Sequence, residues 1–357
     1  MVSLSPTFQP SNLPTLQPSN LPTLQPSNLL TIQPFTMKAL RLSNNGFKVG
    51  NAMLGAHGQT TGSVRVNTHD GDTVNVRLAD NLGLRFLGID SAEVSFTLPG
   101  HRTFVRLTDD RWETFFAQKA WLENSPLDAD LIAHFEARLG DGRDVAPNHA
   151  RHAERAERAL EKEMQADLKA SGLSKEEFAL FMAFGHEFLD GTGRLLCYLN
   201  SDRANFKNHP EADTLALTSY NERQLSSGAA LPYFIWPNIQ PFLSLRPFAP
   251  ENVRPESFWK IVQRSSKLKQ ARSGVAAARA AGLGVFSPED PLRVAPFELR
   301  FLARKSRPDR FVIDLGKPDT HRMLRPAQYF TIADPEDRLF IPSEYVPIFE
   351  MNGWQIG

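Results

Sequence analysis

Residues 84–93 read Leu-Arg-Phe-Leu-Gly-Ile-Asp-Ser-Ala-Glu, an apolar strand with an arginine near its start and two acids just past its end. Arg85 and Asp90 are five positions apart, so a regular strand would place their side chains on opposite faces of a sheet. The strand must therefore end or bulge near Ile89 if both side chains are to reach one site. A strand that simply ends in an acidic loop is the plainer interpretation of the same residues.

Two more strands are predicted before this stretch. Apolar and polar residues alternate over 64–66 and over 74–78, and Asp70-Gly71 favours a turn between them. Asp72 begins the inward-facing row of the second strand, where a carboxylate is costly unless it is hydrated, paired or bound to a cation. Asp-Gly-Asp alone is more often a hairpin turn than a metal site. Three short strands joined by tight turns predict a meander or a small barrel.

A third cluster of polar residues follows much later in the chain. Residues 190–198 read Asp-Gly-Thr-Gly-Arg-Leu-Leu-Cys-Tyr, which brings a second arginine, Arg194, to the start of an apolar strand. Phosphoryl transfer requires stabilisation of negative charge on the phosphate oxygens, which two arginines and a metal ion supply. The sequence therefore contains the residue types that this chemistry needs.

The acids of the first two clusters suit a hard cation. Carboxylate and carbonyl oxygens are the ligands that calcium prefers, and Asp72, Asp90 and the backbone carbonyl of Ser91 offer them. Glu93 would then remain free to orient or deprotonate a water molecule.

In this order the three clusters resemble the signature of the staphylococcal nuclease-like (thermonuclease) family. The matching elements are Asp-Gly-Asp-Thr at 70–73, Arg-x-x-x-x-Asp-Ser-x-Glu at 85–93 and Asp-x-x-Gly-Arg at 190–194. The predicted helix at 220–229 and the longer one at 257–281 look like the family's later helices. The resemblance covers roughly residues 62–95 and 190–290.

The resemblance implies a fold and a mechanism. The fold would be an α+β domain built on a five-stranded OB-type barrel with packed helices. Calcium would be bound by Asp72, Asp90 and the Ser91 carbonyl, and Glu93 would be the general base. Arg85 and Arg194 would be catalytic, holding the scissile phosphate of DNA or RNA while water attacks in line and leaves a 3′-phosphate. The family's base-stacking aromatic falls at Tyr233, or at Phe234 in the alternative alignment.

The sequence departs from the family pattern in three places. Ser91-Ala92-Glu93 stands where the family has Thr-Pro-Glu, and the loss of the proline loosens the loop. Thr192 replaces a tyrosine, which puts one nucleotide contact in doubt. The span between Glu93 and Arg194 is far longer than in the minimal enzyme, so a helical insertion is expected at about 100–175. Within it, residues 146–171 have the composition and spacing of an amphipathic helix.

The domain organisation follows from these assignments. Residues 1–36 repeat a proline-rich octamer without charged residues, which predicts a disordered tail or an upstream-start artefact with Met37 as the true first residue. The nuclease-like domain is expected at 58–290. Residues 292–357 predict a C-terminal accessory module rich in β-structure, with strands at 297–303 and 310–315.

Bulk composition bounds the remaining possibilities. Lys+Arg and Asp+Glu are both 40, so a nucleic-acid partner must be recognised by local charge. The single cysteine, Cys197, excludes an internal disulfide framework and lies in an apolar run that predicts a buried thiol. The chain contains no run of 18 apolar residues and begins without a signal peptide, which predicts no membrane span and favours a cytoplasmic protein.

Three functions remain open from the sequence. The first is an active calcium-dependent endonuclease on DNA or RNA. The second is a non-catalytic domain of the same fold that binds nucleic acid or protein, although such domains usually lose the acids or arginines that this chain keeps. The third is a structural or regulatory protein in which the motif match is coincidental.

Overall fold

The computed structural model describes residues 83–207, 209–239, 249–318 and 320–357, together with the backbone of four short earlier strands. These strands are β1 (Leu40–Leu42), β2 (Lys48–Gly50), β3 (Ala52–Leu54) and β4 (Val76–Leu78). β1 pairs antiparallel with β2, and β3 pairs antiparallel with β4. The repeats at 1–36, the predicted strand at 64–66 and Asp72 lie outside the described residues.

The predicted strand at 84–89 is interrupted at Leu87, two residues before the predicted break near Ile89, which itself lies within a strand. It forms β5 (Leu84–Phe86) and β6 (Gly88–Asp90), and Gly88 has a φ of +75°, which favours glycine. β5 runs parallel to β10 (Leu195–Ser201), which pairs antiparallel with β9 (Leu180–Leu189). β6 instead pairs with β11 (Leu231–Ile235). The break therefore sends the two halves of one segment into two sheets.

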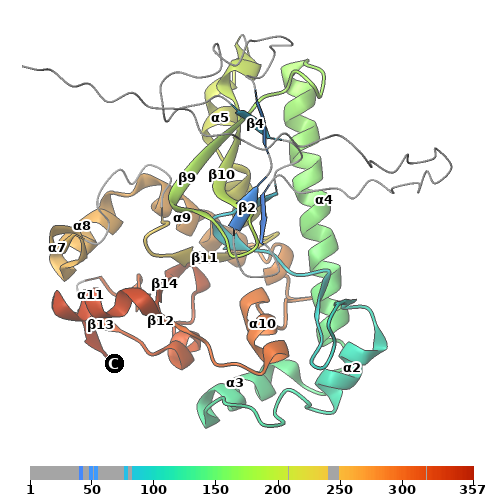
Figure 1. Ribbon diagram of the computed structural model, residues 1–357, viewed down its shortest axis with the longest axis vertical. Helices are drawn as coiled ribbons and strands as arrows, with labels where there is room; N and C mark the ends of the chain where they lie inside the picture. The colour runs from blue at the N-terminus through green and yellow to red at the C-terminus, as the bar shows by residue number, and fades with distance from the viewer. Residues whose placement is uncertain are drawn as a thin grey trace, which may run out of the picture. The chain divides into compact units, whose positions relative to one another are not determined.

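A helical segment separates β6 from β9, as predicted. A hairpin of β7 (Ser95–Thr97) and β8 (Phe104–Arg106) leads into α2 (Asp110–Ala117) and α3 (Ala129–Leu139). The long helix α4 (Val145–Ser171) confirms the predicted amphipathic helix, and it ends at Gly172 in the left-handed conformation (Figure 1). In the first half of this helix, small residues such as Ala146, Ala150 and Ala153 are buried.

The chain after β10 is mainly helical. It forms η1 (Arg203–Phe206), α5 (Ala212–Leu217), α6 (Tyr220–Ser226), α7 (Pro250–Val253), α8 (Pro255–Arg264), α9 (Ser266–Ala280) and η2 (Gly284–Phe286). The predicted single helix at 257–281 is thus two helices. Ser265 has an extended backbone, and its side chain accepts a hydrogen bond from the Leu268 N–H and so caps α9.

The last part of the chain combines helices and short strands. It contains α10 (Pro296–Arg304), β12 (Arg310–Asp314), β13 (Arg322–Met323), η3 (Pro326–Thr331), η4 (Pro335–Asp337), β14 (Arg338–Pro342), η5 (Ser343–Tyr345), α11 (Val346–Met351) and β15 (Gln355–Ile356). β12 confirms the predicted strand at 310–315. The predicted strand at 297–303 is wrong, because these residues form α10.

Local signals at the start of α10 explain that correction. Pro296 occupies the first helical position, where its missing N–H costs nothing. The Glu298 carboxylate accepts a hydrogen bond of 2.6 Å from the Ala295 N–H, as in a capping box. Leu299 and Leu302, one helical turn apart, are both buried.

One sheet joins the C-terminal residues to the nuclease-like segments. Its order is β12-β14-β11-β6, with β14 parallel to β11 and antiparallel to β12 (Figure 1). The sheet belongs to one compact unit and joins strands from before and after residue 290. One hydrophobic core gathers around Trp112 and Phe135, and another around Trp236 and Phe258. Cys197 is fully buried, as predicted.

The fold class is therefore mixed α+β, as the sequence predicts. The sheets have two to four strands, and within the described part of the chain none of them closes into a barrel. The OB-type barrel stays a prediction. No helix among the described residues is long and apolar enough to cross a membrane.

Candidate functional site

A cavity of about 750 Å³ lies where the sheets of β5 and β6 meet the C-terminal segment. Its size is typical of sites that enclose a small molecule. Six arginines line it, and they are Arg85, Arg194, Arg300, Arg304, Arg307 and Arg310. The carboxylates in the lining are Glu187, Asp190, Asp309 and Glu344. The lining therefore has an excess of positive charge, which favours an anionic ligand.

The two predicted catalytic arginines line this cavity from neighbouring strands. β5 and β10 are parallel, and in their register Arg85 is opposite Leu196. The Leu195 N–H donates a hydrogen bond of 2.9 Å to the Gly83 carbonyl. A Cβ atom on Gly83 would lie 3.1 Å from the Cγ of Arg194, so the glycine permits this close approach. The strand pairing thus brings together arginines that are far apart in the sequence.

Asp190 holds Arg194 in place. Its Oδ2 accepts a hydrogen bond of 2.7 Å from Arg194 Nε, and its Oδ1 accepts the backbone N–H groups of Thr192 and Arg194. Burial alone would raise the pKa of Asp190, but these hydrogen bonds lower it. The two terminal nitrogens of Arg194 have no hydrogen-bond partner among the described residues, so they can bind a ligand in the cavity.

The predicted acids Asp90 and Glu93 are bound by an arginine that the sequence analysis missed. Arg300 donates from Nη1 and Nη2 to the two oxygens of Asp90, at 3.0 and 2.7 Å, and from Nη1 to Glu93 Oε1 at 3.0 Å. The side chain of Asp90 is 3% exposed and that of Arg300 15%. Burial lowers the pKa of Arg300, but attraction to Asp90 raises it above its ordinary value. Arg85 Nη2 lies 3.4 Å from Asp90 Oδ1 on the other side.

Helix α4 positions the backbone of Glu93. The backbone N–H of Glu93 donates a hydrogen bond of 3.0 Å to Nδ1 of His149, a buried residue of α4. Burial lowers the pKa of His149 to about 4, so the ring is neutral at pH 7 and its Nδ1 can accept this bond. The helix predicted as an insertion therefore supports the acidic loop directly.

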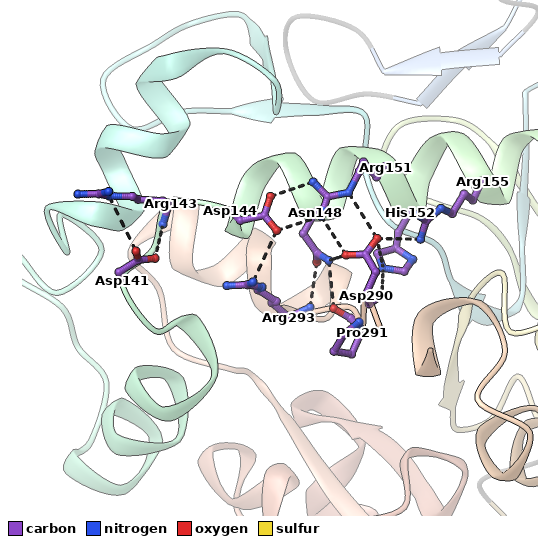
Figure 2. Close-up of polar contacts among 10 residues, drawn as sticks. All are labelled: Asp141, Arg143, Asp144, Asn148, Arg151, His152, Arg155, Asp290, Pro291 and Arg293. Atoms are coloured by element: carbon purple, nitrogen blue, oxygen red, sulfur yellow. Dashed lines mark hydrogen bonds and ion pairs between the residues drawn. The ribbon is translucent and has the colours of Figure 1, made fainter. Parts of the chain in front are cut away.

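The same helix also binds the loop that leads into α10. Figure 2 shows Asp290 among the side chains of α4, where it accepts from Arg151 Nη2 at 2.9 Å and from Asn148 Nδ2 at 2.8 Å. Asn148 also donates to the Pro291 carbonyl and accepts from the Arg293 N–H. Helix α4 therefore contacts both the loop before α10 and the backbone of Glu93. These are the two segments that Arg300 connects through its ion pairs.

Tyr233 lines the cavity, as its predicted contact with nucleotide requires. It lies on β11 opposite Gly88, while Phe234, the alternative, points into the core and is 2% exposed. Phe297 stacks on the Tyr233 ring at 5.2 Å and 11°, and Arg310 donates to the Tyr233 hydroxyl. One face of the ring is thus already covered, and base stacking on Tyr233 stays a prediction.

Of the predicted calcium ligands, Asp90 is already paired with an arginine in this arrangement. Both oxygens of Asp90 and Oε1 of Glu93 are bonded to Arg300, whose guanidinium supplies the neighbouring positive charge. Ser91 is exposed beside them, and Asp72 lies outside the described residues. In the described ranges, His, Cys, Asp and Glu form no group of three or more that could hold a metal ion. We therefore assign no step to calcium.

Arg85, Arg194 and Arg300 line the cavity, whereas Asp90 and Glu93 are not part of its lining and are connected to it through their ion pairs with Arg300. A helix prediction for 296–304 would have shown Arg300 and Arg304 on one helical face, but it would not have shown their partners. Comparisons of the chain with models of known protein families, with curated proteins and with solved structures find no match.

Proposed function

We propose that this chain is a nuclease of the staphylococcal nuclease-like kind, which hydrolyses phosphodiester bonds of DNA or RNA in the arginine-lined cavity. One observation carries the proposal: Arg85 on β5 and Arg194, the residue just before the paired strand β10, come from two distant motifs and line one cavity. Guanidinium groups bind phosphate through paired hydrogen bonds and stabilise charge that develops during phosphoryl transfer. An OB-type barrel that includes β5, β10 and β9 is part of the proposal.

Each residue has a role in the proposed reaction. The terminal nitrogens of Arg194 and the guanidinium of Arg85 hold the scissile phosphate. Glu93 orients a water molecule and accepts its proton through Oε2, because its Oε1 is bonded to Arg300. The water oxygen attacks phosphorus in line with the 5′-oxygen, the P–O5′ bond breaks, and the 5′-oxygen leaves as a hydroxyl with a proton from solvent water, which gives a 3′-phosphate. Arg300 holds the carboxylates of Glu93 and Asp90 in place through its hydrogen bonds.

A second candidate function is favoured by the same arginine. Arg300 neutralises Asp90 and Glu93 with a buried, multidentate contact. A non-catalytic domain that binds nucleic acid in the cavity needs the arginines but no free carboxylate. The binding function therefore remains the alternative to hydrolysis.

One experiment separates the two functions. Plasmid DNA, single-stranded DNA and RNA are incubated with the wild-type protein and with Glu93→Gln, each in Ca²⁺ and in EGTA. The proposal expects cleavage by the wild type, at least a hundredfold slower cleavage by Glu93→Gln, and 3′-phosphate ends. Loss of cleavage in EGTA would support the calcium dependence that the family resemblance implies. Binding without cleavage in either condition would establish the binding module instead.

A further inference from the structure

We propose that Arg304, Arg307 and Arg310 form a second phosphate-binding subsite, which holds the backbone of a single nucleic-acid strand away from the scissile phosphate. These residues lie at the end of α10 and in its connection to β12, and all three line the cavity. The inference rests on the proposed function, because it names the substrate class of the same cavity. It assigns a role to a segment that lies outside the three sequence motifs.

No carboxylate in the described part of the protein balances the charges of these three arginines. Arg85, Arg194 and Arg300 each have a carboxylate partner. Among the described residues, by contrast, neither Arg304, Arg307 nor Arg310 forms an ion pair with a carboxylate, and the nearby Asp309 forms none either. Three guanidinium groups on one wall repel one another, so a bound polyanion would relieve an unfavourable interaction.

Arg310 already donates to the Tyr233 hydroxyl, whereas the contacts of Arg304 and Arg307 leave hydrogen-bond donors available. The Cζ of Arg304 lies 5.2 Å from the centroid of the Phe96 ring, and its N–H groups have no hydrogen-bond partner among the described residues. Arg307 donates from Nε to the Pro126 carbonyl at 2.7 Å, so both of its terminal nitrogens remain. Arg304 and Arg307 are exposed. Each can therefore present a pair of N–H groups to a phosphate.

The connection that carries these arginines is held on both sides. Lys305 ends α10 in the left-handed conformation, and its Nζ lies 3.2 Å from Glu123 Oε2. Arg307 reaches the Pro126 carbonyl, and the Ser343 hydroxyl donates to the Asp309 carbonyl. A segment fixed by such contacts loses little conformational freedom when a ligand binds. The wall is therefore preformed.

The size and lining of the cavity favour a single strand. A volume of about 750 Å³ accommodates one or two nucleotides, whereas a double helix is far too wide to enter it. Tyr233 and Phe297 are half-buried in the same lining and offer apolar surface to an unstacked base. A strand with one phosphate at Arg85 and Arg194 would place a neighbouring phosphate at the α10–β12 connection.

The test compares the binding of a short and a longer ligand in EGTA, and gel electrophoresis after each titration checks that the probes are still intact. The probes are fluorescently labelled dinucleotides and octanucleotides of thymidine and of uridine, and an eight-base-pair duplex. The proteins are the wild type, Arg304→Gln/Arg307→Gln, and Arg264→Gln, which removes an exposed arginine at the end of α8. Circular dichroism melts show whether the variants fold.

We expect the wild type to bind the octanucleotides at least tenfold more tightly than the dinucleotides and the duplex. The double variant should lose about tenfold or more in octanucleotide affinity, with a salt slope lowered by about 1.4 for two phosphate contacts on a single strand. Its dinucleotide affinity and all affinities of Arg264→Gln should stay within twofold of wild type. The ratio of thymidine to uridine affinities shows which nucleic acid is preferred.

Other outcomes overturn the inference in distinguishable ways. Unchanged octanucleotide affinity of the double variant removes the subsite but leaves the proposed function standing. An equal loss for both ligand lengths places these arginines at the scissile phosphate itself. Tighter binding of the duplex refutes the single-strand assignment. A wild-type protein that binds none of the probes contradicts both the subsite and the proposed function.

Discussion

Two parts of the molecule deliver arginines to one cavity, and they differ in how those arginines are held. The strand pair β5 and β10 places Arg85 and Arg194 beside the carboxylates of Asp90 and Asp190. The α10–β12 connection places Arg304 and Arg307 against an aromatic ring and a backbone carbonyl. A carboxylate fixes a guanidinium at one position, whereas an uncharged contact leaves its charge for a ligand. Arg85 and Arg194 therefore suit one phosphate at a fixed position. Arg304 and Arg307 suit backbone phosphates whose positions vary with the bound strand.

The largest effect is expected from the strand arginines. Arg85→Ala and Arg194→Ala should each lower the rate of DNA or RNA cleavage by several orders of magnitude, because each removes charge stabilisation at the scissile phosphate. Folding should change little, since both side chains are about a third exposed. Initial rates on a short substrate and thermal melts measure the two effects.

Arg304→Ala is the matched comparison for these variants. On the same short substrate it should stay within about tenfold of wild type, because its charge would act on a distant phosphate. If Arg304→Ala lowered the cleavage rate as much as Arg194→Ala, the two groups of arginines would not differ in function. Full activity of Arg85→Ala or Arg194→Ala would refute the catalytic assignment.

A second effect distinguishes two arginines of the same helix. Arg300→Gln should destabilise the fold by about 3 kcal/mol, because Asp90 would be left buried with only the longer contact to Arg85. Arg304→Gln, one turn later and exposed, should change the stability by no more than about 0.5 kcal/mol. Urea denaturation at pH 7 measures both values. Equal stabilities of the two variants would show that the Arg300–Asp90 pair contributes nothing.

The sequence predicted one of these two groups and not the other, for a physical reason. Arg85, Asp90 and Glu93 lie within one short segment, and Arg194 begins a strand with its own turn motif, so local pattern was sufficient to identify them. The need for a break could also be anticipated, because otherwise Arg85 and Asp90 would face opposite ways, but its position at Leu87 and not near Ile89 could not. Arg300 lies 207 positions after Glu93, and only tertiary packing brings them together.

The error in α10 shows where local reasoning was insufficient. Alternating apolar and charged residues at 297–303 fit a strand, but Pro296 and Glu298 start a helix there. Strand order in the sheet β12-β14-β11-β6, which joins segments before and after residue 290, is likewise not encoded in any single segment. The helix α4, by contrast, was evident from spacing alone.

The start of α10 should also give the protein a measurable acid sensitivity. Burial would raise the pKa of Glu298, but Arg138 and hydrogen bonds from His134, Tyr329 and Ala295 lower it to about 2. The unfolded value is 4.5. Because the folded pKa is depressed, the stabilisation is complete above pH 4.5 and is lost as the pH falls towards 2. By pH 3 this residue should account for a loss of about 2 kcal/mol.

Glu298→Gln provides the comparison for that prediction. The variant lacks the titrating group, so its stability should fall by about 2 kcal/mol less than that of the wild type between pH 5 and pH 3. Urea denaturation at several pH values gives both curves. Parallel curves for the two proteins would show that the environment of Glu298 does not depress its pKa.

The smallest effect is expected where α4 binds the loop before α10. The carboxylate of Asp290 pairs with Arg151 and Arg155, but these arginine side chains are 41% and 51% exposed (Figure 2). Pairs in water contribute little, so Asp290→Asn should cost no more than about 1 kcal/mol, and Asp141→Asn, at a fully solvated pair, close to nothing. Activity should be retained, since Asn148 still bonds the Pro291 carbonyl and the Arg293 N–H. A cost above about 2 kcal/mol, or a loss of cleavage, would show that this network is needed to place α10 and Arg300.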